Sequence, residues 1–320
     1  GFLSAQILWG QDVGRYSNDN FGVNLERDNF ASQLYHRSPN DPDYVMTYLQ
    51  ELGVGHIRTS IPNVTGSNLG WFNAVWDMFI NASNNYNIKL TLVINKGYWG
   101  SSGYNQDFLD ALSAKVAQYA GQVAYYQIGN ENDTNMEYDG VTAAEIKEYL
   151  EDVSAVIRSA DPNTKIILGG IAGADKLISS GNPTPGTDGN PVDYCWFEDL
   201  LAEGCGNYVD YYAFHTYVAS EVSDPAFDDI RKQVSLMANY IKRTGAPQHP
   251  LIITEFGHPI DGDYPFTPYG QTTEDYQNRF NTKKVLRTLA ADIQGIYPVV
   301  RLDMFCLQDY HLTDAQGNWT

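Results

Sequence analysis

The hydrophobic positions of the chain fall into short runs rich in β-branched residues, separated by amphipathic stretches. Eight of these runs have the length and composition of strands: Phe21–Leu25, His56–Thr59, Lys89–Ile94, Ala124–Ile128, Lys165–Leu168, Val209–Phe214, Leu251–Thr254 and Val299–Phe305. Helical spacing of apolar residues predicts helices between them, at Tyr44–Leu52, Trp71–Asn81, Asp107–Tyr119, Ala143–Ala160, Cys195–Ala202, Asp224–Thr244 and Thr273–Ile293. Strand and helix therefore alternate along the sequence.

The clearest helical pattern covers Ala143–Ala160. Its apolar side chains recur at spacings of three and four residues, at Ile146, Tyr149, Leu150, Val153, Val156 and Ile157. Thr142 and Glu145 are placed to form a capping box at its start, and Asp161-Pro162 predicts its end. We expect one face of this helix to be buried.

The alternation predicts an α/β fold. Strands that are separated by helices are parallel, and continuously apolar runs such as Lys165–Leu168 are typical of strands covered on both faces. Eight repeats fit a closed (β/α)8 TIM barrel, which takes about 250 residues, so the surplus falls in loops such as Asn182–Pro191. No linker divides the chain. We therefore expect a single catalytic domain over residues 1–320, with residues 1–20 as an N-terminal segment that packs on the barrel.

The C-terminal end of this barrel is short. Only Gln308–Thr320 follow the eighth predicted strand, too few residues for an ordinary closing helix. We expect either that Phe2–Trp9 covers the gap or that the chain was cut after its last strand.

Composition narrows the classes of partner. With 320 residues and 43% hydrophobic content, the chain can bury the core of one large barrel or of two ordinary domains. Its formal charge of −19 argues against nucleic acid or an anionic membrane as partner. No run of 18 apolar residues predicts a membrane span.

The chain starts at Gly1 with no initiator Met and no basic, apolar leader, which fits a mature or trimmed chain. We expect an extracellular or periplasmic monomer.

The three cysteines, Cys195, Cys205 and Cys306, leave two alternatives. A disulfide could join the first two, or all three could be buried free thiols, and the odd number favours the second alternative.

Two of the apolar runs stop abruptly at a glutamate, and this feature carries the chemistry. Glu131 follows the fourth predicted strand and Glu255 the seventh. A carboxyl group at the mouth of a buried strand is costly unless it is used or paired, and a pair of carboxyl groups is what hydrolysis of a glycosidic bond requires. The carboxyl ends of barrel strands meet at one rim, so the two side chains should face each other across its mouth. Either glutamate alone could instead cap a helix or pair with an arginine.

Three segments and one arginine together resemble clan A of the glycoside hydrolases, which includes families 5 and 39. They are Gly129-Asn130-Glu131, His215-Thr216-Tyr217, Thr254-Glu255-Phe256-Gly257 and Arg58. The order of elements supports this resemblance over nearly the whole barrel, but only about a dozen residues carry it by identity. It is specific to the clan and not to a family or substrate.

The resemblance implies a retaining double displacement. Glu131 would be the acid that protonates the leaving oxygen and then the base that activates water, and Glu255 would be the nucleophile. Arg58 and Tyr217 would stabilise the anion of Glu255, and Asn130 would bind the sugar 2-hydroxyl. His215 could be a structural histidine, but its place beside Tyr217 assigns it to the site.

Aromatic and amide groups follow the third predicted strand. Sugars have apolar faces between their hydroxyls, so Tyr98 and Trp99 would provide stacking surfaces and Asn95 a polar partner. The chain departs from the clan pattern at two places. Asn95 stands where several relatives have a histidine, and Phe305–Gln308 stand where many have a tryptophan. Family and substrate preference therefore stay open.

We expect a retaining glycosidase that cleaves a β-linked polysaccharide or oligosaccharide, with endo attack favoured by the aromatic content. The alternatives are a non-catalytic carbohydrate-binding barrel and a transglycosylase that uses the same intermediate. A phosphate-binding barrel is disfavoured because glycine-rich turns are missing after the seventh and eighth strands. The six histidines form no close cluster of ligand spacing, so we expect no metal and no other cofactor.

Overall fold

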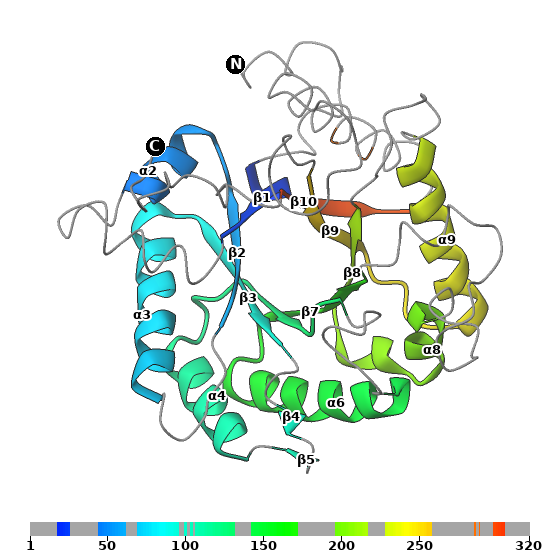
Figure 1. Cartoon of the computed structure of the whole chain (residues 1–320), viewed down its shortest axis with the longest axis horizontal. Coiled ribbons are helices and arrows are strands. Elements are labelled where there is room, and N and C mark those ends of the chain that lie inside the picture. The colour runs from blue at the N-terminus through cyan, green and yellow to red at the C-terminus, as the bar shows by residue number, and fades with distance from the viewer. Residues whose placement is uncertain are drawn as a thin grey trace, which may run out of the picture.

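A computed structural model describes residues 18–25, 44–61, 69–95, 99–100, 103–104, 106–131, 142–171, 196–216, 228–257, 285, 288 and 297–304. Within these residues, parallel strands form a closed barrel in the order β1-β10-β9-β8-β7-β6-β3-β2 (Figure 1). The strands are β1 (Phe21–Asn24), β2 (His56–Ser60), β3 (Lys89–Ile94), β6 (Tyr125–Ile128), β7 (Lys165–Ile171), β8 (Tyr211–Thr216), β9 (Leu251–Phe256) and β10 (Val299–Met304). The predicted (β/α)8 barrel is confirmed.

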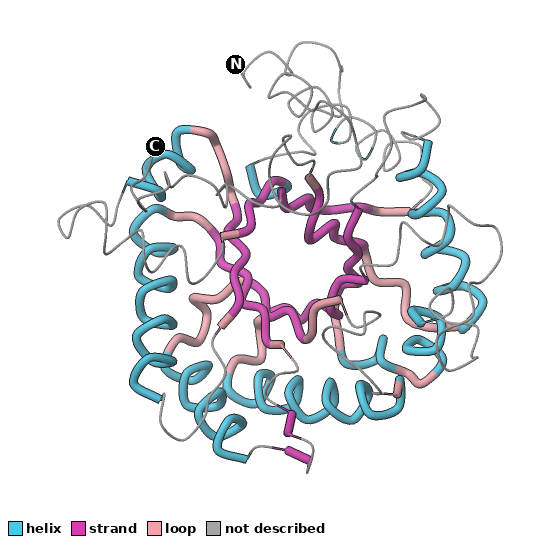
Figure 2. The backbone as a smooth tube through the Cα atoms, in the orientation of Figure 1, coloured by secondary structure: helices cyan, strands magenta, loops and turns pink. Residues whose placement is uncertain are grey.

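The described helices lie outside this ring of strands, along its left, lower and right sides in the view of Figure 2. They are α2 (Tyr44–Glu51), α3 (Leu69–Tyr86), α4 (Gln106–Gln118), α6 (Ala143–Ala160), α8 (Trp196–Ala202) and α9 (Asp228–Thr244). Short 3-10 turns, η3 (Asn18–Asn20) and η6 (Cys205–Tyr208), precede β1 and β8. A two-stranded hairpin, β4 (Trp99–Gly100) and β5 (Gly103–Tyr104), lies in the connection after β3. The predicted helix Thr273–Ile293 lies outside the described residues apart from positions 285 and 288.

Local signals account for α6. Its bounds are those predicted, and both halves of the capping box are present, because the Thr142 side chain accepts from the Glu145 backbone and the Glu145 side chain accepts from the Thr142 backbone. Asp161 ends the helix in an extended conformation.

Most other elements differ from their predicted extents by one or two residues at an end, and α3 and β7 differ by more. Helix α3 runs from Leu69 to Tyr86 instead of Trp71–Asn81, and Ser83 in the added last turn is buried. Strand β7 continues through Gly169-Gly170 to Ile171 instead of ending at Leu168.

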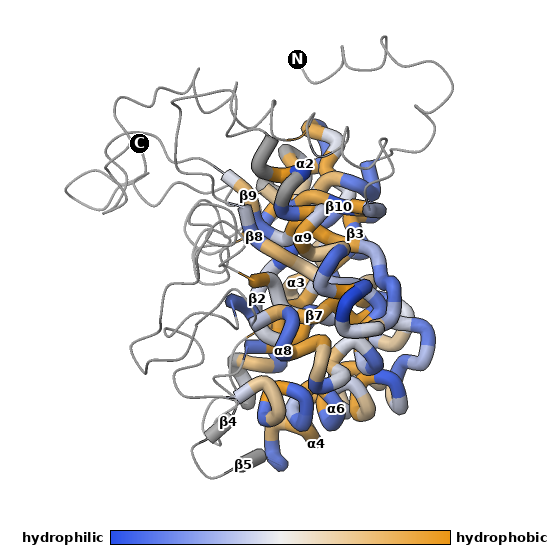
Figure 3. Tube along the Cα trace, turned by 90° about the vertical axis from the view of Figure 1, so that its right-hand side faces the viewer, coloured by the Kyte–Doolittle hydropathy of each residue, from blue (hydrophilic) through white to orange (hydrophobic). Residues whose placement is uncertain are grey.

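Most of the hydrophobic core lies between the strands and the helices, where the large side chains of α3, Phe72, Trp76 and Phe79, are fully buried. Figure 3 shows the apolar segments concentrated in this inner layer. A smaller cluster, made of Ile167, Ala213 and Ile252, fills part of the barrel interior. Cys205 is a buried free thiol, which rules out the Cys195–Cys205 disulfide.

An ion pair between Arg301 and Asp303 also lies inside the barrel. Nη2 of Arg301 is 2.8 Å from Oδ2 of Asp303, and both side chains are almost completely buried. The Arg301 guanidinium stacks on Tyr125 and contacts Nδ1 of His56 at 3.4 Å. Burial lowers the pKa of His56 to about 2, and the nearby Arg301 adds to this shift. Burial also raises the pKa of Asp303, against the opposing effect of Arg301.

Several sequence predictions concern residues that the structure does not describe. These are the packing of residues 1–20 before Asn18, the closing of the barrel by Phe2–Trp9, and the contribution of Phe305–Gln308. Among the described helices, none is both long enough and apolar enough to cross a membrane.

Candidate active site

The segment after β6 places Glu131 at the carboxyl end of the barrel. Gly129 has a φ of 83° and Glu131 a φ of 46°, so the chain turns through the left-handed region directly after the strand. This conformation is uncommon for a residue with a side chain, so contacts with neighbouring strands must stabilise it. The backbone N–H of Glu131 donates to the carbonyl of Gly170 on β7 at 2.8 Å.

Glu255 reaches the same end from the other side of the barrel. It lies within β9, where a register irregularity between Phe214 and His215 makes His215 the partner of Glu255 across the β8–β9 pair. The Glu255 residue is only 6% exposed. A carboxylate buried to this degree needs a compensating charge.

Arg58 provides this charge. It lies on β2, and its Nη1 is 2.8 Å from Oε1 of Glu255, with both side chains buried. The same guanidinium donates to three side-chain amide oxygens: Asn24, Gln127 at 2.8 Å and Asn130 at 2.5 Å. Because arginine has only donors in a fixed planar arrangement, these four acceptors define its position.

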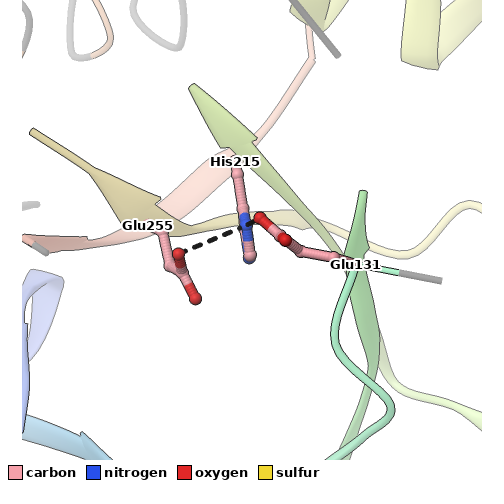
Figure 4. A group of neighbouring side chains, drawn as sticks. All are labelled: Glu131, His215 and Glu255. Carbon is pink, nitrogen blue, oxygen red and sulfur yellow. Dashed lines mark hydrogen bonds and ion pairs between the residues drawn. The ribbon is translucent and has the colours of Figure 1, made fainter. Parts of the chain in front are cut away.

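His215 lies between the two glutamates (Figure 4). Its Nδ1 is 3.0 Å from Oε1 of Glu131 and 3.4 Å from Oε2 of Glu255. The three side chains offer atoms that all lie within 4.8 Å of one another. Carboxyl groups about 5 to 5.5 Å apart suit a retaining glycosidase, whereas an inverting one needs about 6.5 to 9.5 Å to accommodate a water. The geometry therefore favours retention.

The two carboxyl groups have different surroundings. Glu255 is buried and paired with a permanent cation, whereas the Glu131 side chain is 22% exposed and contacts His215. A pair in which one carboxylate stays ionised and the other exchanges a proton is the division that acid/base chemistry with a nucleophile requires.

The structure thus brings together five of the predicted site residues: Glu131, Glu255, Arg58, Asn130 and His215.

The predicted residues of the rim are described in part. Asn95 follows β3 and is half-buried, and its buried side-chain oxygen has no hydrogen-bond partner within the described part of the chain. Trp99 belongs to β4, where its backbone pairs with that of Tyr104 in a short hairpin. Tyr98 and Tyr217 lie outside the described residues. Their predicted roles stay predictions.

Sequence reasoning missed Asn24, Gln127 and Gly170. Asn24 ends β1 and Gln127 is fully buried within β6, and both contribute an acceptor to Arg58. A polar residue inside an otherwise apolar strand was the available signal for Gln127. The carbonyl of Gly170 accepts the backbone N–H of Glu131. In the sequence, the Gly169-Gly170 pair indicated only that the strand ended at Leu168.

The fold also brings together a set of groups that could ligate a metal. Glu131, His215 and Glu255 are far apart in sequence, yet among the described residues they form a group with the composition of a metal site. Chemistry with two carboxyl groups needs no metal, so the expectation of a metal-free enzyme stays a prediction.

Comparison with known proteins places this chain in a family. Residues 77–291 match the model for Cellulase (glycosyl hydrolase family 5). The chain is 31% identical over 160 residues to endoglucanase E-5 of Thermobifida fusca, an alignment that covers 49% of this chain but only 28% of the relative. The chain thus matches little more than a quarter of the length of that curated relative.

Two solved structures illustrate the likeness of fold. The catalytic domain of Thermobifida fusca endoglucanase Cel5A, in complex with cellotetraose, superposes with a TM-score of 0.53 at 18% identity, covering 90% of this chain and 79% of that one. The GH39 enzyme from Xanthomonas axonopodis pv. citri gives a TM-score of 0.56 at 15% identity, covering 90% and 58%. At these identities the likeness concerns the fold.

Proposed function

The chain belongs to glycosyl hydrolase family 5, and from this we propose that it cleaves a β-linked polysaccharide internally, with retention of configuration at the anomeric carbon. The observation that carries the proposal is the pair of carboxyl groups of Glu131 and Glu255, whose nearest oxygens lie within 4.8 Å. The curated relative that it resembles is named an endoglucanase, which suggests a β-glucan as the first substrate to test.

In the proposed first step, an oxygen of Glu255 attacks the anomeric carbon. The bond to the leaving oxygen breaks as Glu131 gives that oxygen its proton. In the second step Glu131, now a carboxylate, takes a proton from water, and this water displaces Glu255 from the anomeric carbon. Both glutamates end in their starting states.

The contacts of Glu255 support its assignment as the nucleophile. Its Oε1 accepts from Arg58 at 2.8 Å, and its Oε2 lies 3.4 Å from His215. The arginine offsets the charge of a buried carboxylate and leaves the second oxygen on the side of Glu131. The Glu131 side chain is 22% exposed and lies 3.0 Å from Nδ1 of His215, which suits a group that must exchange a proton with the substrate and with water.

The anomeric form of the first product tests the stereochemistry. Proton NMR recorded during the first minutes of hydrolysis of a cello-oligosaccharide should show the β-anomer before mutarotation. Accumulation of the α-anomer would overturn the assignment of both glutamates, because inversion requires a different separation of carboxyl groups. A panel of β-glucan, β-mannan and xylan, read by product length, would establish the sugar and the internal position of attack.

Variants test the two roles separately. Glu255→Gln should abolish turnover of every substrate, while a matched change of the exposed Glu203→Gln should leave it unchanged. Glu131→Ala should lose most activity on substrates with poor leaving groups, and added azide should partly restore the rate on activated aryl glycosides. No turnover by the unaltered chain on any substrate would favour a non-catalytic carbohydrate-binding barrel. Transfer of the glycosyl unit to an added alcohol would measure transglycosylation.

We also propose an extracellular or periplasmic location and a monomeric state. A polysaccharide outside the cell cannot readily cross a membrane, so an enzyme that cleaves it acts outside the cytoplasm. This supports the proposed location. Fractionation of the source cells and light scattering of the purified chain would test both proposals.

A further inference from the structure

Two adjacent glycines of β7 lie directly behind the candidate catalytic groups. A β carbon on Gly170 would be 2.3 Å from Nε2 and 2.6 Å from Cδ2 of His215, and 2.8 Å from the hydroxyl of Thr254. A β carbon on Gly169 would be 2.5 Å from the backbone carbonyl carbon of Gly129. These distances are shorter than van der Waals contact, so neither position accepts a side chain without movement of its neighbours.

The contact at Gly170 is directional. Nε2 and Cδ2 form the edge of the imidazole ring opposite Nδ1, and Nδ1 is the atom that faces Glu131 at 3.0 Å and Glu255 at 3.4 Å. A methyl group on Gly170 would press on the back of the ring. The ring has little room to move aside, because His215 is completely buried.

Gly170 also acts on Glu131 through the backbone. Its carbonyl accepts the N–H of Glu131 at 2.8 Å, and Glu131 adopts the left-handed conformation with a φ of 46°. A displaced β7 strand would therefore move both the glutamate and the histidine that contacts it.

We propose that Gly170 is a positioning residue of the active site. Its missing side chain sets how closely Nδ1 of His215 approaches the two carboxyl groups, and its carbonyl fixes the turn that carries Glu131. This inference rests on the proposed function, since it concerns the same two carboxyl groups.

The first test compares two glycine-to-alanine variants. Gly170→Ala should lower kcat on an unactivated oligosaccharide about 100-fold, with KM nearly unchanged, because a displacement of about 1 Å in a catalytic group has an effect of this size. Gly70→Ala is the matched control, because Gly70 lies on the exposed side of α3 and a β carbon there has no neighbour within 4 Å. Equal kcat for the two variants would overturn the proposal.

The second test asks whether Gly170 acts through the histidine. In a His215→Ala background the ring that the methyl group would strike is gone, so adding Gly170→Ala should lower kcat on an activated aryl glycoside less than about threefold. If Gly170→Ala alone fails to fold, the double variant should recover a cooperative unfolding transition. The same loss of activity in both backgrounds, or failure of both variants to fold, would show that Gly170 does not act through His215.

A third measurement does not depend on turnover. The chain has six histidines, and the ring signals of His215 can be assigned by their loss in His215→Ala. In NMR spectra these signals should shift in Gly170→Ala and stay in place in Gly70→Ala. Unchanged signals would refute the positioning role even in an active enzyme. A chain without glycosidase activity whose signals shift would refute the proposed function alone.

Discussion

Removal of the Arg58 guanidinium tests the electrostatic basis of the site. Arg58→Met keeps most of the side-chain length but leaves Glu255, only 6% exposed, without its cation. Breaking a buried ion pair by removing one partner costs about 3 to 5 kcal/mol. The buried amide oxygens of Asn24 and Gln127 also lose a donor, and each adds about 1 kcal/mol or more, whereas the Asn130 oxygen keeps its hydrogen bond from Gln127. We expect a loss of at least about 4 kcal/mol in the free energy of unfolding at pH 7.5.

A second change separates the two contributions. In Arg58→Met/Glu255→Gln the buried charge is gone but the amide oxygens still lack their donor, so the double variant should be about 2 kcal/mol more stable than Arg58→Met. The penalty of Arg58→Met should also shrink as pH falls, because an unpaired buried carboxylate takes up a proton. The matched control is Arg243→Met, which removes a 62% exposed arginine from Glu198 and should cost less than about 1 kcal/mol.

Urea unfolding, followed by tryptophan fluorescence at several pH values, measures these quantities together with the Glu255→Gln single variant. The double-mutant cycle then gives the coupling energy between Arg58 and Glu255. Equal unfolding free energies for Arg58→Met and the double variant at pH 7.5 would refute the argument that charge compensation of Glu255 dominates.

Three further predictions concern the fold. Burial lowers the pKa of His56 from 6.5 to about 2, with a further effect of Arg301, so the unfolded chain alone binds this proton and stability falls by about 1.4 kcal/mol per pH unit below 6.5. Urea unfolding at pH 7.5 and 5.5 should show a smaller loss in His56→Gln, and an equal loss would contradict the assignment. Burial raises the pKa of Cys205 to about 12, so mass spectrometry after iodoacetamide treatment at pH 8 should find this thiol modified only in unfolded protein. Thr142→Ala, which removes the acceptor of the Glu145 N–H, should lower the melting temperature by an amount equivalent to about 1 kcal/mol, and an unchanged value would exclude the cap from the stability of α6.

The elements that local signals determine were predictable from the sequence. β3 and α6 have the predicted bounds, because their apolar periodicity and the capping box act within the element itself. Glu131 and Glu255 were predictable as a pair because parallel barrel strands converge at one end. The rule needs only their predicted positions at strand ends and no knowledge of their distance, whereas Arg58 was assigned through the resemblance to clan A.

The partners within the site were not predictable in the same way. Arg58 contacts Asn24, 34 residues away, and Glu255, 197 residues away. Which acceptors it selects depends on barrel registers that no local pattern encodes. The extension of β7 through Gly169-Gly170 was missed for a related reason. Glycine signals a break when read locally, whereas here neighbouring backbone and His215 leave no space for any other residue.

The hydrogen bond from Arg58 to Asn130 determines which group Asn130 can offer to a ligand. A free carboxamide can present either its oxygen or its nitrogen, but the Asn130 oxygen already accepts from Arg58 at 2.5 Å and from Gln127 at 3.3 Å. The amide is thereby locked in one flip state, and its NH2 group is the end turned away from the guanidinium. Asn130 therefore offers hydrogens and no lone pairs, so its ligand partner must be an oxygen that accepts.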